Sequence, residues 1–259
     1  MAGTIDTSVP HSARIWNYWL GGKDNYEVDR IAGEQFLQIF PGMREGALAS
    51  RGFLTRTIAW LAGEAGIRQF LDIGTGLPTA DNTHEIAQRV APESRVVYAD
   101  NDPLVLAHAR ALLTSAPEGA TDYVDADVRD PGTILAAAAA TLDFTRPIAL
   151  NLSGIMGHVV DDEQALAIVR QLLDALPPGS YLALNDGSNV HSAANRQAHQ
   201  EYNESGALPY VQRSPEQIGR FFDGLELVEP GLVSVSRWRP LGIREPAEVD
   251  GYGAVGRKP

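Results

Sequence analysis

The stretch that decides the fold is Phe70-Leu71-Asp72-Ile73-Gly74-Thr75-Gly76-Leu77-Pro78-Thr79. Three apolar residues around one acid predict a short buried strand, and two glycines follow it at once. A strand that ends in a glycine turn and opens a helix is how an open α/β sheet presents backbone N–H groups to a ligand. Glycine is needed because a Cβ would stand between the backbone and the ligand. One Gly-x-Gly is equally typical of an ordinary tight turn, so the rest of the chain must decide.

Strands and helices alternate after this turn. Apolar runs predict parallel strands at 69–73, 95–99, 122–124, 147–152 and 180–185, with helical periodicity between them. Capping boxes begin helices near Asn82 and Ser214, and Asp-Pro pairs at 102 and 130 begin two more. Residues 190–205 are polar and predict a surface helix or a loop. The sequence therefore predicts a doubly wound α/β fold, a mostly parallel sheet with helices on both faces.

Both ends of the chain add to this pattern. Strand-like runs at 231–238 and 252–257 have no helix between them, which indicates an antiparallel neighbour at the edge of the sheet. Three helices are expected within residues 12–65, before the first strand. We expect residues 1–66 to form an N-terminal helical cap over a domain at 67–259, the two making one compact unit. Trp16 and Trp19 belong either to a packed helix face or to a cover over a ligand.

Composition narrows the class of protein. The 259 residues are 44% hydrophobic and carry a formal net charge of −12, which argues against a general nucleic-acid binder. The chain has no cysteine, so disulfides and thiolate zinc sites are excluded, and no metal site is expected. No signal peptide is visible, and no apolar run approaches the roughly 18 residues of a membrane helix. We expect a cytoplasmic protein with neither a membrane nor a nucleic-acid partner.

Polar residues follow every predicted parallel strand. They are Gly74-Thr75-Gly76, Asp100-Asn101-Asp102, Asp125-Ala126-Asp127, Asn151-Leu152-Ser153 and Asp186. One acid after a strand is most often a helix cap, and Asp102 and Asp130 fit that role. Ligands of open α/β sheets bind outside the carboxyl ends of the strands. Five polar strand ends on one edge therefore predict a binding site.

The order of these groups indicates a cofactor that contains a nucleoside. A carboxylate after the second strand, Asp100, can accept both ribose hydroxyls, while Asp127 either accepts from an adenine amine or is a plain loop acid. A dinucleotide site would need glycine where Thr79 stands and an acid about 20 residues on, whereas Asp100 lies 26 after Gly74. There is no P-loop sequence. S-adenosylmethionine, which has adenosine, no phosphate and an amino-acid end, fits the pattern better.

These motifs resemble those of class I S-adenosylmethionine-dependent methyltransferases. The resemblance rests on Asp72-Ile73-Gly74-Thr75-Gly76, Val97-Tyr98-Ala99-Asp100 and Val124-Asp125-Ala126-Asp127. More narrowly, the chain is similar to a bacterial S-adenosyl methyltransferase family long listed as of unknown function. The narrower match rests on Ala13-Arg14-Ile15-Trp16-Asn17-Tyr18-Trp19-Leu20-Gly21-Gly22-Lys23-Asp24-Asn25-Tyr26, Gly76-Leu77-Pro78-Thr79, Asn82-Thr83-His84-Glu85, Phe221-Phe222-Asp223-Gly224-Leu225 and Arg257-Lys258-Pro259. The class implies a Rossmann-like sheet of seven strands with the last antiparallel.

The resemblance also implies roles for the motif residues. The cofactor-binding set it implies is Asp72, Gly74, Thr75, Gly76, Asp100, Asn101, Asp127, Val128, Asn151 and Ser153. The glycine turn would face the methionine end, with Asp72 beneath it near the amino group. Asp100 would bind the ribose, and Asp127 with Val128 the adenine edge. Asn151 and Ser153 depart from the Asn/Asp-Pro-Pro-Tyr pattern of amino-directed nucleic-acid methyltransferases, which counts against DNA as the acceptor.

Function is expected to be methyl transfer to a small molecule. A general base is needed only if the acceptor loses a proton during attack. His158 and Tyr26 are the candidates we assign to catalysis, with His84 and Asp186 also near the rim. The alternative role for His84 is a helix cap, and that for His158 is a satisfied loop histidine. A nicotinamide-dependent oxidoreductase and a non-catalytic S-adenosylmethionine-binding protein stay open as alternatives. The attacked atom and the oligomeric state are not indicated.

Overall fold

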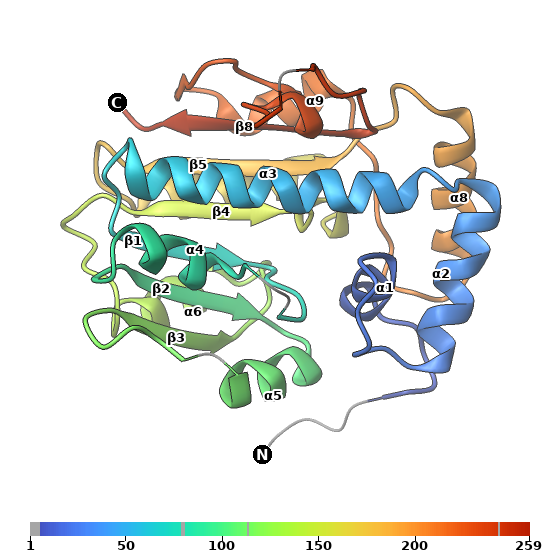
Figure 1. Ribbon diagram of the computed structural model, residues 1–259, viewed down its shortest axis with the longest axis horizontal. Helices are drawn as coiled ribbons and strands as arrows, with labels where there is room; N and C mark the ends of the chain where they lie inside the picture. Colours follow the sequence, from blue (N-terminus) through green and yellow to red (C-terminus); the bar gives the residue numbers. More distant parts are fainter. Residues whose placement is uncertain (1–5, 79–80, 113, 243) are drawn as a thin grey trace.

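One mixed sheet organises the chain (Figure 1). The computed structural model describes residues 6–78, 81–112, 114–242 and 244–259. The strand order is β3-β2-β1-β4-β5-β8-β6, with β7 paired to β8 beside this path. The first five strands are parallel, and β8 is antiparallel to β5, β6 and β7. The strands are β1 (Gln69–Ile73), β2 (Arg95–Asp100), β3 (Ala120–Asp125), β4 (Ala149–Ser153), β5 (Tyr181–Gly187), β6 (Glu226–Leu227), β7 (Val233–Ser234) and β8 (Gly251–Arg257).

Helices cover both faces of this sheet, as the sequence predicts. Successive strand residues point to opposite faces of the sheet, so each central strand contributes side chains to two hydrophobic cores. On β1, Leu71 and Ile73 pack in the core beneath α6 (Pro131–Ala138) and α7 (Asp162–Asp174). Phe70 packs in the other core, beneath α3 (Met43–Gly63) and α4 (Thr83–Val90). The run of apolar residues in each central strand is explained by burial on both faces.

The predicted helix starts are confirmed. Asn82 and Glu85 form the capping box of α4, and Ser214 and Gln217 form that of α9 (Pro215–Gly219). Asp130 caps α6 by accepting a hydrogen bond from the backbone of Thr133. Before α5 (Pro103–Leu112), Asp102 accepts from Leu104 N at 2.9 Å. These local side chain–backbone bonds need no tertiary contact, which explains why the sequence alone could show them.

The carboxyl-terminal third differs from the prediction. Within the run at 231–238 only β7 forms a strand, and a 3₁₀ turn at Val235–Arg237 follows it in place of the predicted continuation. Arg56 of α3 donates hydrogen bonds to the carbonyls of Val235 at 2.6 Å and Trp238 at 2.7 Å, and both side chains are fully buried. This contact with a distant helix overrides the local strand pattern. The two-residue strand β6 follows another 3₁₀ turn (Arg220–Phe222) and was not predicted.

Three helices stand beyond the carboxyl ends of the parallel strands (Figure 1). They are α1 (Ser12–Trp19), α2 (Glu27–Ile39) and α8 (Ala193–Glu204). The polar segment at 190–205 is thus mostly helical, and Phe36 of α2 packs edge-on against His199 of α8 with ring centroids 4.9 Å apart. Helix α3 instead packs on the sheet itself. The division into a helical cap at 1–66 and a domain at 67–259, the two making one compact unit, stays a prediction.

None of the described helices has the length and apolar character needed to cross a bilayer.

A buried carboxylate joins the first two helices. Asp29 of α2 has no exposed surface and accepts hydrogen bonds from the backbone N–H groups of His11 and Tyr26, each at 2.9 Å. Its carboxylate also pairs with Arg14 Nε of α1 at 3.3 Å. One side chain therefore satisfies donors at the start of both helices, and we expect their arrangement to depend on it.

Replacing Asp29 tests this dependence. Asp29→Ala leaves Arg14 buried without its partner, so the free energy of unfolding should fall by about 3 kcal/mol in urea titrations. Gln35→Ala, at an exposed position of the same helix, should change it by no more than about 0.5 kcal/mol. Equal stability of the two variants would contradict this role for Asp29.

Candidate active site

A cavity of about 480 Å³ lies at the carboxyl ends of the parallel strands. All five polar strand ends predicted from the sequence contribute to its wall, through Gly74, Asp100, Asp127, Ser153 and Asp186. Helices α1, α2, α3 and α8 supply much of the remaining wall. The fold thus brings together residues that are far apart in the chain, at the edge where open α/β sheets bind ligands.

The glycine turn after β1 has the geometry that the sequence predicts. Gly74 and Gly76 have φ angles of +74° and +62°, which favour glycine. A Cβ on Gly74 would come within 2.6 Å of Ile155, so its place is already filled. Gly76 lines the cavity, and its Cβ position is open space. Thr79, where a dinucleotide site would have a third glycine, lies outside the described residues.

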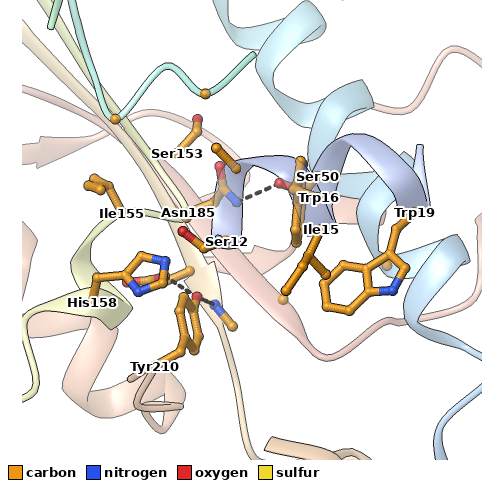
Figure 2. Close-up of a pocket in the computed structure, with 18 of the residues that line it drawn as sticks. Ser12, Ile15, Trp16, Trp19, Ser50, Ser153, Ile155, His158, Asn185 and Tyr210 are labelled. Atoms are coloured by element: carbon orange, nitrogen blue, oxygen red, sulfur yellow. Dashed lines mark hydrogen bonds between the residues drawn. The ribbon is translucent and has the colours of Figure 1, made fainter. Parts of the chain in front are cut away.

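Asp72 lies beneath this turn, as expected. Its Oδ1 accepts from Asn151 Nδ2 at 2.6 Å and its Oδ2 from Thr83 Oγ1 at 2.5 Å. Burial raises the pKa of Asp72, and these two hydrogen bonds work against the rise. Asn151 itself does not line the cavity; it holds Asp72 in place and accepts from Ser153 Oγ at 3.1 Å. Ser153 reaches the cavity wall (Figure 2).

Asp100 ties the end of β2 to the glycine turn. Its Oδ2 accepts from Gly76 N at 2.9 Å and its Oδ1 from Asp102 N at 3.0 Å. Burial raises the pKa of this carboxyl group, and the two backbone bonds lower it. Thr75 Oγ1 lies 3.5 Å from Tyr123 Oη on β3. The carboxylate is therefore held at the cavity wall by backbone donors, with lone pairs left for further donors.

The loop after β3 is joined to the same wall. Asn101 Nδ2 donates to Asp127 Oδ2 at 2.9 Å, and Arg129 pairs with that carboxylate at 3.1 Å. Val128, between them, is buried against the cavity. Arg129 also donates to the carbonyl of His158 at 2.6 Å. Asp127 thus has protein partners already, and any ligand contact would be added to these.

The sequence assigned two residues to catalysis, and the structure brings one of them, His158, to the cavity (Figure 2). It ends the 3₁₀ turn at Met156–His158. Its Nδ1 lies 3.0 Å from the carbonyl of Pro209, which can only accept, so Nδ1 carries the proton. Burial lowers the pKa of His158 to about 4. The ring is therefore neutral at pH 7 and presents Nε2 as a hydrogen-bond acceptor.

Tyr26 and His84 lie elsewhere. Tyr26 precedes α2 and packs with Ala13 and Leu77, under the guanidinium group of Arg14, and it is not among the described residues that line the cavity. His84 is buried at the start of α4, where its Nδ1 lies 2.9 Å from Tyr98 Oη. His84 therefore has the structural role that the sequence left open. Among the described residues, no group of three or more His, Asp or Glu side chains is placed to hold a metal ion.

Sequence reasoning missed several residues of the cavity wall, Tyr210 among them. Tyr210 donates its hydroxyl hydrogen bond to Asp186 and accepts one from Gly187 N at 2.8 Å. Burial raises the pKa of Asp186 to about 6. His199 of α8 and Arg51 of α3 also line the cavity. Tyr210 lies in a segment without regular structure, so no periodicity could have marked it.

The comparisons with known proteins agree with this geometry. A family model described as S-adenosyl methyltransferase matches residues 1–259. The chain belongs to the S-adenosyl methyltransferase family. This methyltransferase therefore uses S-adenosylmethionine as its methyl donor, as the motifs indicate. A search among curated proteins gave no significant match.

Two solved structures resemble this methyltransferase over nearly their whole length. One is a DUF574 family protein from Streptomyces avermitilis, 49% identical, covering 99% of this chain and 100% of that one with a TM-score of 0.94. The other is a candidate methyltransferase from Thermobifida fusca, 41% identical, covering 98% and 96% with a TM-score of 0.90. An S-adenosylmethionine-dependent methyltransferase from Anabaena variabilis, at 15% identity and a TM-score of 0.51, shares the fold.

The low pKa of His158 predicts how stability depends on pH. The unfolded chain binds a proton here near pH 6.5, whereas the folded protein binds it only near pH 4. The unfolded state therefore takes up more protons between these values, and the free energy of unfolding falls as pH drops. Between pH 7 and pH 5, the free energy of unfolding of His158→Gln should therefore fall by about 2 kcal/mol less than that of the wild type, as measured by urea unfolding.

A substitution that involves no titratable group provides the control. Gln38 lies on α2, and its side chain is exposed. Gln38→Ala should keep the pH dependence of the wild type. An identical loss of stability in His158→Gln and the wild type would show that His158 is charged in the folded protein.

Proposed function

We propose that this methyltransferase transfers a methyl group to a small molecule bound in the same cavity as the cofactor. One observation carries the proposal: the polar strand ends and the helices α1, α2 and α8 line one continuous cavity. Its far wall is largely apolar, formed by residues such as Trp19, Phe36 and Leu54. Concave, mostly apolar sites with a few polar groups are typical of small ligands.

The adenosine part of the cofactor is assigned to the ends of β2 and β3. Asp100, fixed by two backbone donors, would accept the ribose hydroxyls, with Asn101 beside it. Asp127 would accept from the adenine amine, while Val128 contacts the ring. These assignments are supported by the presence of all four residues on one wall.

The methionine part is assigned to the glycine turn. Its amino group would face Asp72, whose carboxylate is anchored by Asn151 and Thr83. Its carboxylate would face the backbone of Gly74–Gly76 and the guanidinium group of Arg51. Ser153, on the neighbouring strand, completes this part of the wall. A zwitterion would thus meet a group of opposite charge at each end.

The charges on the wall also favour this cofactor over a dinucleotide. Among the described lining residues there are seven carboxylates and two guanidinium groups. S-adenosylmethionine, when bound, supplies a methyl group on a positively charged sulfur, which such a wall stabilises. The diphosphate of a nicotinamide dinucleotide would be repelled.

A cytoplasmic location stays a prediction.

Calorimetric titration tests the cofactor assignment. Wild type should bind S-adenosylmethionine and S-adenosylhomocysteine and should not bind NAD. Asp100→Ala should weaken the binding of both adenosyl ligands by at least tenfold, because hydrogen bonds to a charged group contribute about 1.5–3 kcal/mol each. Circular dichroism would confirm that the variant is folded.

Asp125 provides a matched control on the neighbouring strand. It stands directly beside Asp100 in the register of β2 and β3, but its side chain is exposed and is not part of the described cavity wall. Asp125→Ala should bind both adenosyl ligands as the wild type does. NAD binding in preference to the adenosyl ligands would overturn the proposal, and tight cofactor binding without any turnover of acceptors would favour a sensor.

A further inference from the structure

Six aromatic rings form a continuous run along the cavity wall. They are His158, Tyr210, His199, Phe36, Trp19 and Trp16, with successive ring centroids 5.0, 5.5, 4.9, 5.0 and 5.9 Å apart. The run passes from the 3₁₀ turn after β4 through α8 and α2 to α1. Figure 2 shows His158 and Tyr210 on one side of the cavity and Trp16 and Trp19 on the other. Such a wall suits a flat, apolar ligand.

The two histidine rings of this run offer hydrogen-bond acceptors. Nδ1 of His158 and Nδ1 of His199 each lie 3.0 Å from a backbone carbonyl, of Pro209 and of Asn195. Each Nδ1 therefore donates, and each Nε2 keeps a lone pair. Burial lowers the pKa of both rings to about 4, so neither carries a charge at pH 7. A ligand that forms a hydrogen bond with either Nε2 must supply an N–H or O–H donor.

The charge at this end of the cavity is negative. Asp186 and Asp250 line it, and Asp186 is 2% exposed. Two guanidinium groups line the described cavity. Arg51 lies near Asp72 at the cofactor end, and Arg129, which donates to the carbonyl of His158, is paired with Asp127. Buried Arg213, the cation that acts on Asp186, is itself paired with Asp162 at 2.9 Å. A ligand that carries or develops positive charge is therefore favoured over an anion.

We propose that the methyl acceptor is an amine carried on a flat, apolar body. This inference rests on the proposed function and names the acceptor class of that site. The aromatic run holds the body, and His158 Nε2 accepts a hydrogen bond from the N–H of the attacking nitrogen. Asp186, which accepts a hydrogen bond from Tyr210, supplies the negative field.

The chemistry of the transfer agrees with this field. An amine that is protonated in solution gives this proton to water, and its lone pair then forms the new N–C bond. The C–S bond breaks and leaves its electron pair on sulfur, so one positive charge moves from sulfur to nitrogen and the product is a methylated ammonium ion. His158 and Asp186 interact more strongly with the nitrogen as this charge develops. A phenolate or carboxylate acceptor would instead be repelled by Asp186 and Asp250.

Three indole compounds separate these possibilities by binding alone. Tryptamine, tryptophol and indole-3-propionate share one ring system and differ in an amine, a hydroxyl and a carboxylate. With the protein saturated with S-adenosylhomocysteine, calorimetry should show tryptamine binding at least tenfold more tightly than tryptophol, and indole-3-propionate binding most weakly.

Two variants of equal net charge identify the source of the preference. Asp186→Asn keeps the oxygen that accepts from Tyr210 but removes the charge, so tryptamine should bind about tenfold more weakly and tryptophol should be unchanged. Asp174→Asn, at the exposed end of α7, should bind all three as the wild type does.

The outcomes separate the amine inference from the proposed function on which it rests. Three outcomes would overturn the amine inference and leave the cofactor assignment intact. Indole-3-propionate could bind more tightly than tryptamine, the two variants could have equal effects, or the protein could bind S-adenosylhomocysteine but none of the indoles. A wild-type protein that fails to bind S-adenosylhomocysteine would overturn the proposed function itself, and the amine inference with it.

Discussion

The site depends on the hydrogen bond between Gly76 N and the carboxylate of Asp100. It fixes the turn after β1 to the end of β2, and the bond from Gly74 N to the carbonyl of Ala99 at 2.8 Å reinforces it. Two positive φ angles allow the backbone to make this close approach. Because parallel strands end at one edge of the sheet, everything that follows β3, β4 and β5 is placed relative to this turn.

The methyltransferase fold provides the cofactor half of the cavity, and elements outside the central strands provide the other half. Asp72 and Asp100 come from the sheet and Asp127 from the loop after β3, whereas the aromatic run is built mainly by α1, α2 and α8. Asp29 joins α1 to α2, so a fully buried charge determines where Trp16 and Trp19 stand. The cofactor is thus assigned to the sheet and its loops, and the acceptor preference to the aromatic run together with His158 and Asp186.

Local signals explain which sequence predictions succeeded. The strand at 69–73 and the capping boxes at Asn82 and Ser214 depend on neighbours within four residues, and the structure has them where they were predicted. The run at 231–238 failed because Arg56, far away in the chain, binds the carbonyls of Val235 and Trp238. Tyr26 carries a plausible chemical group, yet packing against Leu77 keeps it from the described cavity wall.

The sequence by itself determined the fold class, the edge of the sheet that carries the site and the nature of the cofactor, because strand periodicity, glycine turns and strand-end acids are encoded over short stretches. Only the tertiary structure decided which nitrogen of His158 keeps its lone pair and which groups surround Asp186. The tautomer of His158 depends on the carbonyl of Pro209, and the environment of Asp186 depends on Tyr210. Protonation and desolvation are set by groups that meet only when the chain has folded.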